Sequence, residues 1–378
     1  MKNPIKKIIS NNFLLLLLTC SITVDAQELV SGSVIGRHIF GLATDYQGDP
    51  VLIKDSPAIY KRSLFDEKIS IENHSIMVSV LNESNKNNDS IAGVYITQLE
   101  PKTNRPLDTV ALDLSTIGGL SSPGGFTRTK WNSILVTESG IFNSVHPSEF
   151  IDIFKPYYKG KSKLVNPYNY GWVSEIIALS SQGQGKAKAI KNYAVGRLFA
   201  NQVILMPDGK TIYLLDKIGN LYLFISEQAN SLVKGELYVI NRQQGQIKHT
   251  SLGKTSALKV KFKLKKITFD SLFQASKPIN QGCSKKFKYI KTIYGEECLK
   301  LKPRNKKYTA VFEPIRSMAL QGISSFTTEN SRMEFNAENN QLIIEHTDKT
   351  KIYLDFDPKQ DQNQNHKLNS QFIIKETK

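Results

Sequence analysis

Short apolar runs separated by turn residues dominate the chain between residues 74 and 357. Runs such as those at 74–81, 92–100 and 132–139 are rich in β-branched and aromatic residues, which is typical of strands. Asp208-Gly209 lies between two such runs and predicts a tight hairpin turn. Many strands at even spacing predict an all-β fold: a sandwich, a barrel or a propeller.

Helical signals are sparse in the same region. We expect helix only at 269–276 and a helical turn at 315–321. The segment 257–266 instead alternates with period two, which predicts a strand with lysines on one face and apolar residues on the other (Lys259, Lys261, Lys263 and Lys265 against Val260, Phe262 and Leu264). Two interpretations stay open for these lysines: a solvated strand face that guards a sheet edge, or a ridge that binds anions.

The N-terminus has the features of a secretory leader. Lysines precede a short apolar core at 13–18, and Val-Asp-Ala at 24–26 has small residues where signal peptidase prefers them. The sequence therefore predicts a signal peptide over 1–26 and a periplasmic or secreted mature protein. Cys20 follows Leu-Leu-Thr, a poor lipobox, which argues against a lipoprotein.

The chain is strongly basic, with a formal net charge of +16 at pH 7. Such a field favours anionic partners: phosphate, phosphomonoesters or anionic components of the cell envelope. Export argues against nucleic acid as the partner. The last residues, 358–378, are polar and predict a loosely ordered tail.

Two cysteines, Cys283 and Cys298, remain after the predicted leader. In an oxidising compartment this predicts one disulfide that closes a short loop. On the chain-entropy estimate it stabilises the fold by about 3 kcal/mol. A metal role for the pair is not expected, because no histidine or third cysteine lies nearby.

A family resemblance begins at residues 121–139, SSPGGFTRTKWNSILVTES. This segment resembles the Gly-Gly, Trp-Asn-Thr and Glu elements of the PhoX-type alkaline phosphatases. The likeness continues, in the order of that family, at 157–176, 191–226, 235–240, 296–326 and 332–344. It implies a β-propeller, which we expect over 27–357, and an exported phosphomonoesterase. In that family, carboxylates and one cysteine hold calcium and iron at the propeller axis.

The resemblance also implies site residues. Glu138, which ends an apolar run, Asp216, Glu334 and, by a weaker match, Glu83 correspond to acidic positions that hold metal. Carboxylate oxygens are the ligands that Ca²⁺ prefers, so these residues suit such a site. Arg197 and Lys217 are the expected contacts to a phosphate group. The alternative interpretation is that these carboxylates are strand-end residues paired with lysines.

The chain departs from the family at several of these positions. Ser122 stands where the family has its cysteine, and Ser139 where it has a second acidic residue. Ala200 and Asn201 replace a histidine and a glutamate, and Lys217 replaces a carboxylate. Calcium is therefore the expected cofactor, and the loss of the cysteine argues against iron. The chain also ends before the family's last blades, which predicts an incomplete or atypically closed propeller, or one completed by a partner protein.

Two functions remain open at this point. One is an exported phosphatase with a reduced metal site made only of oxygen ligands. The other is a catalytically inactive propeller that binds an anion or a protein in the cell envelope.

Overall fold

The computed structural model describes residues 63–356, apart from 72–73, 85–89, 146–150, 152–153, 180–186, 244–245 and 281. It also describes four two-residue strands before them, β1 (Val34–Ile35), β2 (His38–Ile39), β3 (Leu52–Ile53) and β4 (Ser56–Pro57). The predicted leader, 1–26, and the predicted tail, 358–378, lie outside the described residues.

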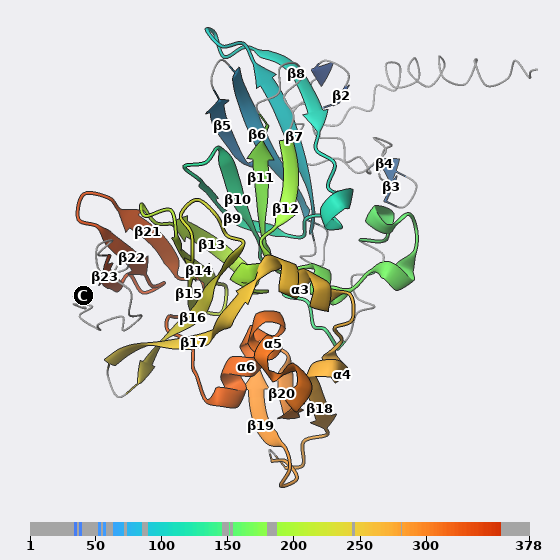
Figure 1. Cartoon of the computed structure of the whole chain (residues 1–378), viewed down its shortest axis with the longest axis vertical. Coiled ribbons are helices and arrows are strands. Elements are labelled where there is room, and N and C mark those ends of the chain that lie inside the picture. Colours follow the sequence, from blue (N-terminus) through green and yellow to red (C-terminus); the bar gives the residue numbers. More distant parts are fainter. Residues whose placement is uncertain are drawn as a thin grey trace, which may run out of the picture.

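Four antiparallel sheets follow one another along the chain, each built from strands that are consecutive in sequence (Figure 1). The first contains β5 (Ser63–Ile71), β6 (His74–Ser84), β7 (Ser90–Leu99) and β8 (Pro106–Ala111). The second contains β9 (Pro123–Arg128), β10 (Ser133–Glu138), β11 (Val173–Ala178) and β12 (Ala187–Lys191). The third contains β13 (Ala200–Leu205), β14 (Thr211–Asp216), β15 (Leu221–Ser226), β16 (Lys234–Gln243) and β17 (Gln246–Ser256). The fourth contains β21 (Arg332–Asn336), β22 (Gln341–Glu345) and β23 (Lys351–Asp355).

Along the chain, a smaller layer that contains helices comes between the third and fourth sheets. It consists of β18 (Phe273–Ser276), β19 (Lys288–Thr292) and β20 (Gly295–Leu301), with α3 (Ala257–Leu264), α4 (Phe269–Leu272), α5 (Lys306–Phe312) and α6 (Pro314–Gln321). Short 3-10 turns connect the elements: η1 (Ser115–Ile117), η2 (Lys155–Tyr158), η3 (Ser162–Leu164), η4 (Pro167–Asn169), η5 (Tyr193–Val195) and η6 (Pro303–Asn305). Cys283 and Cys298 form a disulfide in this layer, as the sequence predicts. The fold is mostly β, which confirms the expected class, and none of the described sheets closes on itself.

The middle sheets are buried on both faces, which explains their continuous apolar sequences. Side chains alternate across a strand, so Ile134 and Val136 of β10 pack against the first sheet. Leu135, between them, packs against the third sheet. In β14, Leu214 faces the second sheet, whereas Tyr213 faces the fourth. Each strand therefore needs apolar residues at successive positions.

The first strands of the four sheets contact one another in series. Between β5 and β9, the rings of Phe65 and Phe126 stack with their centroids 3.9 Å apart. Strand β9 lies directly against β13 at Gly124 and Gly125. Between β13 and β21, Gln202 Nε2 donates to the Ser331 carbonyl (2.7 Å), and Met333 N donates to Gln202 Oε1 (2.6 Å). The sheets thus meet at their first strands and diverge from there (Figure 1).

Gly124 and Gly125 lie in strand β9. A Cβ on Gly125 would stand 2.6 Å from Gln202 Cα, and one on Gly124 would stand 2.8 Å from Asn201 Cα. Both neighbours are backbone atoms, so no side-chain rotation could make room. The two glycines are what allows β9 and β13 to approach this closely.

Replacing Gly125 by alanine is expected to destabilise the protein by roughly 1–3 kcal/mol, because the added methyl group pushes two backbones apart. Urea unfolding of the purified chain measures the change. Gly282→Ala is the matched control, since its nearest neighbouring atom would be 3.4 Å from the new Cβ. Equal stability of the two variants would contradict the close-packing role.

The prediction of a strand at 257–266 is wrong. Residues Ala257–Leu264 form the helix α3, which buries Val260 and Leu264 against the small layer. These two residues are four positions apart, so the same segment also satisfies the helical period. The helix predicted at 269–276 is partly right: α4 covers its first half, and β18 its second. The helical turn predicted at 315–321 is confirmed within α6.

Candidate functional site

Glu138 is the last residue of β10 and is completely buried. Its Oε1 accepts hydrogen bonds from Ser121 N (2.9 Å) and from the Lys191 ammonium group (3.0 Å). Its Oε2 accepts from Gly171 N and Trp172 N, both at 3.0 Å. Both carboxylate oxygens are therefore satisfied by protein donors, as a buried charge requires.

Lys191 ends β12 and is buried with Glu138. Its Nζ also donates to the Asn169 carbonyl (2.6 Å) and lies 4.7 Å from the centre of the Tyr170 ring. Burial lowers the pKa of Lys191, and the neighbouring Glu138 carboxylate opposes that shift. This is the arrangement of the alternative interpretation, a strand-end carboxylate paired with a lysine. Sequence reasoning did not single out Lys191, although the period of β12 places it on the buried face with Ala189.

Asp216 ends β14 and organises the turn that leads to β15. Its Oδ1 accepts from Ile218 N (3.0 Å) and Asn220 N (2.8 Å). Its Oδ2 accepts from Asn220 Nδ2 (2.6 Å) and the Tyr222 hydroxyl (3.3 Å). Burial raises the pKa of Asp216 to about 7, although these hydrogen bonds lower it. The neighbouring Lys217 side chain is exposed.

The raised pKa of Asp216 predicts a pH-dependent stability. Between about pH 4 and about pH 7 the folded state retains a proton that the unfolded chain releases, so stability falls as the pH rises. The decrease, relative to Asp216→Asn, is at most about 1.4 kcal/mol per pH unit and levels off above about pH 7. Urea unfolding of both proteins across this range measures it. A difference that does not vary with pH would contradict the shifted pKa.

The other two expected metal ligands, Glu334 and Glu83, lie on other strands than Glu138 and Asp216. Glu334 is exposed on β21, and Glu83 lies in β6, with its side chain outside the described set. No three histidine, cysteine, aspartate or glutamate side chains in the described ranges come together as a group that could hold a metal ion. The expected convergence of Glu138, Asp216 and Glu334 is therefore not seen there. The surroundings of Glu138 and Asp216 also do not fit a calcium site, because nitrogen donors and hydroxyl groups already occupy their oxygens.

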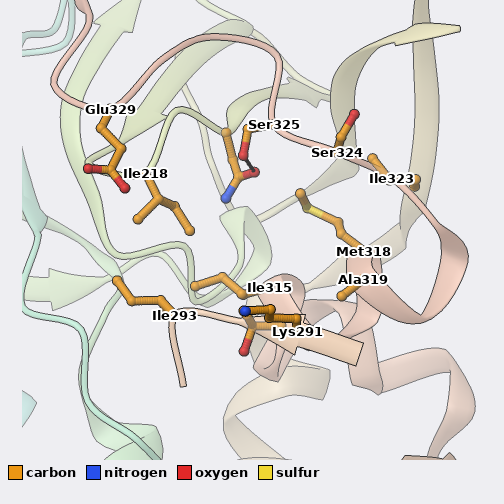
Figure 2. Close-up of a pocket in the computed structure, with 12 residues that line it drawn as sticks. Ile218, Lys291, Ile293, Ile315, Met318, Ala319, Ile323, Ser324, Ser325 and Glu329 are labelled. Carbon is orange, nitrogen blue, oxygen red and sulfur yellow. Dashed lines mark hydrogen bonds between the residues drawn. The ribbon is translucent and has the colours of Figure 1, made fainter. Parts of the chain in front are cut away.

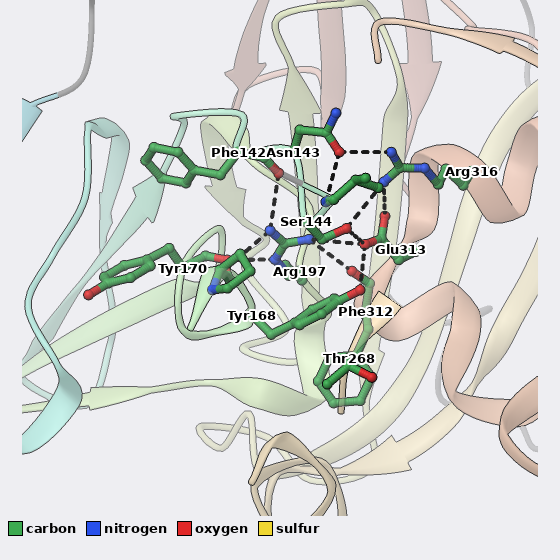
Figure 3. Close-up of polar contacts among 12 residues, drawn as sticks. Phe142, Asn143, Ser144, Tyr168, Tyr170, Arg197, Thr268, Phe312, Glu313 and Arg316 are labelled. Carbon is green, nitrogen blue, oxygen red and sulfur yellow. Dashed lines mark hydrogen bonds and ion pairs between the residues drawn. The ribbon is translucent and has the colours of Figure 1, made fainter. Parts of the chain in front are cut away.

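Arg197 lies in the packed interior rather than on a surface that could meet a phosphate group (Figure 3). Its guanidinium group stacks 4.4 Å from the centre of the Phe199 ring. It donates to four backbone carbonyls, those of Tyr170 (2.8 Å), Pro167 (3.1 Å), Phe312 (3.2 Å) and Phe142 (3.3 Å). Arg197 thus joins the segments around η4 to the end of α5, which is a structural role.

Glu313, between α5 and α6, is the centre of a buried polar network (Figure 3). It accepts hydrogen bonds from Ser144 Oγ, from the Tyr168 hydroxyl (2.8 Å) and from Arg316 Nη1 (2.8 Å). Arg197 Nη1 lies 3.8 Å from its Oε1. Sequence reasoning missed this network, because its members are far apart in the chain and nothing in the sequence indicates that they meet.

Arg316 extends the network to the small layer. Its guanidinium group makes a two-point contact with Glu297 of β20, Nε to Oε2 at 2.8 Å and Nη2 to Oε1 at 2.9 Å. Nη2 also donates to Asn143 Oδ1 (2.9 Å). Arg316 therefore ties α6 both to β20 and to the segment that follows β10. The network holds the helical layer onto the sheets.

A pocket of about 500 Å³ lies beside this network, between α6, the β19–β20 hairpin, the β14–β15 turn and the loop that precedes β21 (Figure 2). Ile218, Ile315 and Met318 supply apolar lining, and Lys291 and Glu329 supply opposite charges. The lining therefore combines apolar side chains with polar and charged ones. The turn built by Asp216 forms one wall, since Asn220 also lines the pocket.

No protein-family model matches the chain, and no curated protein matches it. No helix within the described ranges is long and apolar enough to cross a membrane.

Proposed function

We propose that the chain is a β-propeller of the PhoX type. The support is the series of four antiparallel sheets, each consecutive in sequence and each touching the next through its first strand. Blades around a propeller axis are arranged in this way. The proposal keeps the expectation that the ring is closed atypically or completed by a partner protein.

We further propose that this propeller is a non-catalytic binding module of the cell envelope. The observation that carries the proposal is the Glu138–Lys191 pair, fully buried and 3.0 Å apart. Glu138 is one of the residues that the resemblance assigns to metal, and here a lysine ammonium group neutralises it. A divalent cation at this carboxylate would be repelled by that ammonium group at short range. Neutral residues at Ser122, Ser139, Ala200 and Asn201 are consistent with the loss of a metal cluster.

The rival function is a phosphomonoesterase, which the order of the motifs favours. The test is hydrolysis of p-nitrophenyl phosphate by the purified mature chain, with and without added Ca²⁺, together with its metal content. We expect no hydrolysis above the uncatalysed rate and no stoichiometric metal. Hydrolysis that EDTA abolishes, and that a folded Glu138→Gln variant lacks, would establish the enzyme and overturn the proposal.

The ligand of a non-catalytic module would be anionic, because the chain carries a net charge of +16. Inorganic phosphate alone would bind weakly and with strong screening by salt. Titration calorimetry with phosphate at increasing ionic strength tests this point. Tight, salt-independent binding would instead indicate a preorganised phosphate site.

A further inference from the structure

Helix α3 has two apolar faces, of which only one is covered. Val260 and Leu264 are buried and hold the helix on the small layer. Leu258 and Phe262 are 71% and 73% exposed. They are four residues apart, so they lie side by side on the outer face of the helix. Large apolar side chains exposed as an adjacent pair indicate a contact surface.

Lysines surround this pair. Four of the lysines on α3 and just beyond it are exposed (Lys259, Lys261, Lys265 and Lys266). Lys265 Nζ lies 5.8 Å from the centre of the Phe262 ring, so a positive charge lies close to the apolar pair. Helix α3 itself contains no acidic residue.

The same part of the chain holds most of the protein's net charge. Residues 257–307 contain fourteen lysines and one arginine but only three acidic residues, which amounts to +12 of the net +16. Two of those acidic residues are already paired, Glu296 with Lys291 and Glu297 with Arg316. The field of this layer is therefore positive around the exposed face of α3.

We propose that this face of α3 docks on the surface of an anionic lipid bilayer. Leu258 and Phe262 enter the boundary between headgroups and acyl chains, and the surrounding lysines contact lipid phosphates. The proposal deepens the envelope-binding function proposed above and rests on it for its setting. It describes peripheral attachment and requires no spanning segment.

Lysines around an exposed apolar pair favour a lipid surface over a polyanion without an apolar layer. A bilayer presents negative phosphates directly above an apolar layer, which matches lysines around an apolar pair. Lysine side chains can lay their methylene stems along the apolar layer and keep the ammonium group among the headgroups. A nucleic acid would engage the lysines but would leave Leu258 and Phe262 in water.

The test is sedimentation of the full mature chain with vesicles of phosphatidylcholine, alone or mixed with phosphatidylglycerol. We expect binding only to the mixed vesicles and weaker binding as salt is raised. Leu258→Ser/Phe262→Ser is expected to lower the partition coefficient by about tenfold or more, because both side chains lose their burial in lipid. Lys259→Gln, Lys261→Gln and Lys265→Gln are each expected to lower the partition coefficient roughly fivefold.

Matched controls come from exposed residues elsewhere. Leu107→Ser/Leu164→Ser removes two exposed leucines from β8 and η3, and Lys248→Gln removes an exposed lysine of β17. Both are expected to bind mixed vesicles as the parent protein does. Circular dichroism and thermal melting check that each variant is folded. Equal losses in the controls would overturn the assignment to α3.

A second readout follows insertion itself. Phe262→Trp places a tryptophan on the exposed face, and its emission is expected to shift to the blue on mixed vesicles and to be quenched by brominated lipid. Unchanged emission, or vesicle binding that needs the lysines but not Leu258 and Phe262, would overturn insertion. Competition with duplex DNA gives a further check. Insertion would also be overturned if DNA displaced the parent protein and the Leu258→Ser/Phe262→Ser variant from vesicles equally well. These outcomes are independent of phosphatase activity, so failure here is distinguishable from failure of the proposed function.

Discussion

Replacing Glu313 by glutamine is expected to destabilise the protein by about 3–5 kcal/mol. The carboxylate lies between two buried guanidinium groups, 2.8 Å from Arg316 and 3.8 Å from Arg197. Without its charge, Arg197 keeps only neutral carbonyl acceptors. An uncompensated buried charge is costly because water no longer solvates it. Urea unfolding, followed by circular dichroism, measures the loss.

Glu345→Gln is the control for this prediction. Its carboxylate pairs with Lys349 and Lys351 at the surface, where water screens the charges. We expect its unfolding curve to overlay that of the parent protein. A double-mutant cycle with Arg316→Met separates the Glu313–Arg316 coupling from the other contacts of each residue. A Glu313→Gln variant as stable as the parent would show that the network does not hold the helical layer in place.

The second large effect is expected at Glu138 and Lys191. Glu138→Gln leaves the Lys191 ammonium group buried without its counter-charge, which is expected to cost about 3–5 kcal/mol. Lys191→Met is expected to cost less, because three backbone N–H groups still donate to the Glu138 carboxylate. The double variant Glu138→Gln/Lys191→Met should recover much of the first loss, since no buried charge remains. Chemical unfolding of the three variants measures the coupling.

The same variants distinguish a lysine-neutralised site from a metal site. EDTA is expected to leave the melting temperature of the parent protein unchanged, because its Glu138 is neutralised by Lys191. Added Ca²⁺ is expected to leave the melting temperature of Lys191→Met unchanged as well, because backbone N–H groups still occupy both oxygens of the Glu138 carboxylate. A large decrease in the parent's melting temperature on adding EDTA would contradict this account and favour the enzyme.

The sequence by itself determined the local elements of the sheets. The apolar runs of β10 and β14 are continuous because both faces of each strand are buried, and this shows in the sequence. Asp208 makes its turn with its own neighbours, accepting hydrogen bonds from Lys210 N and Thr211 N. The disulfide between Cys283 and Cys298 followed from the cysteine count and the predicted compartment. All of these features depend on residues close together in the chain or on composition.

Tertiary structure decided the rest, because the deciding partners are distant in sequence. The segment of α3 fits both the strand and the helix period, and burial of Val260 and Leu264 in the small layer selects the helix. The sequence indicated that Glu138 ends a buried strand, but not that Lys191, 53 positions away, neutralises it. The need for glycine at position 125 comes from β13, whose backbone leaves no room for a Cβ there. Whether a carboxylate binds a metal or a lysine depends on what surrounds it in space, and that is set by packing between sheets.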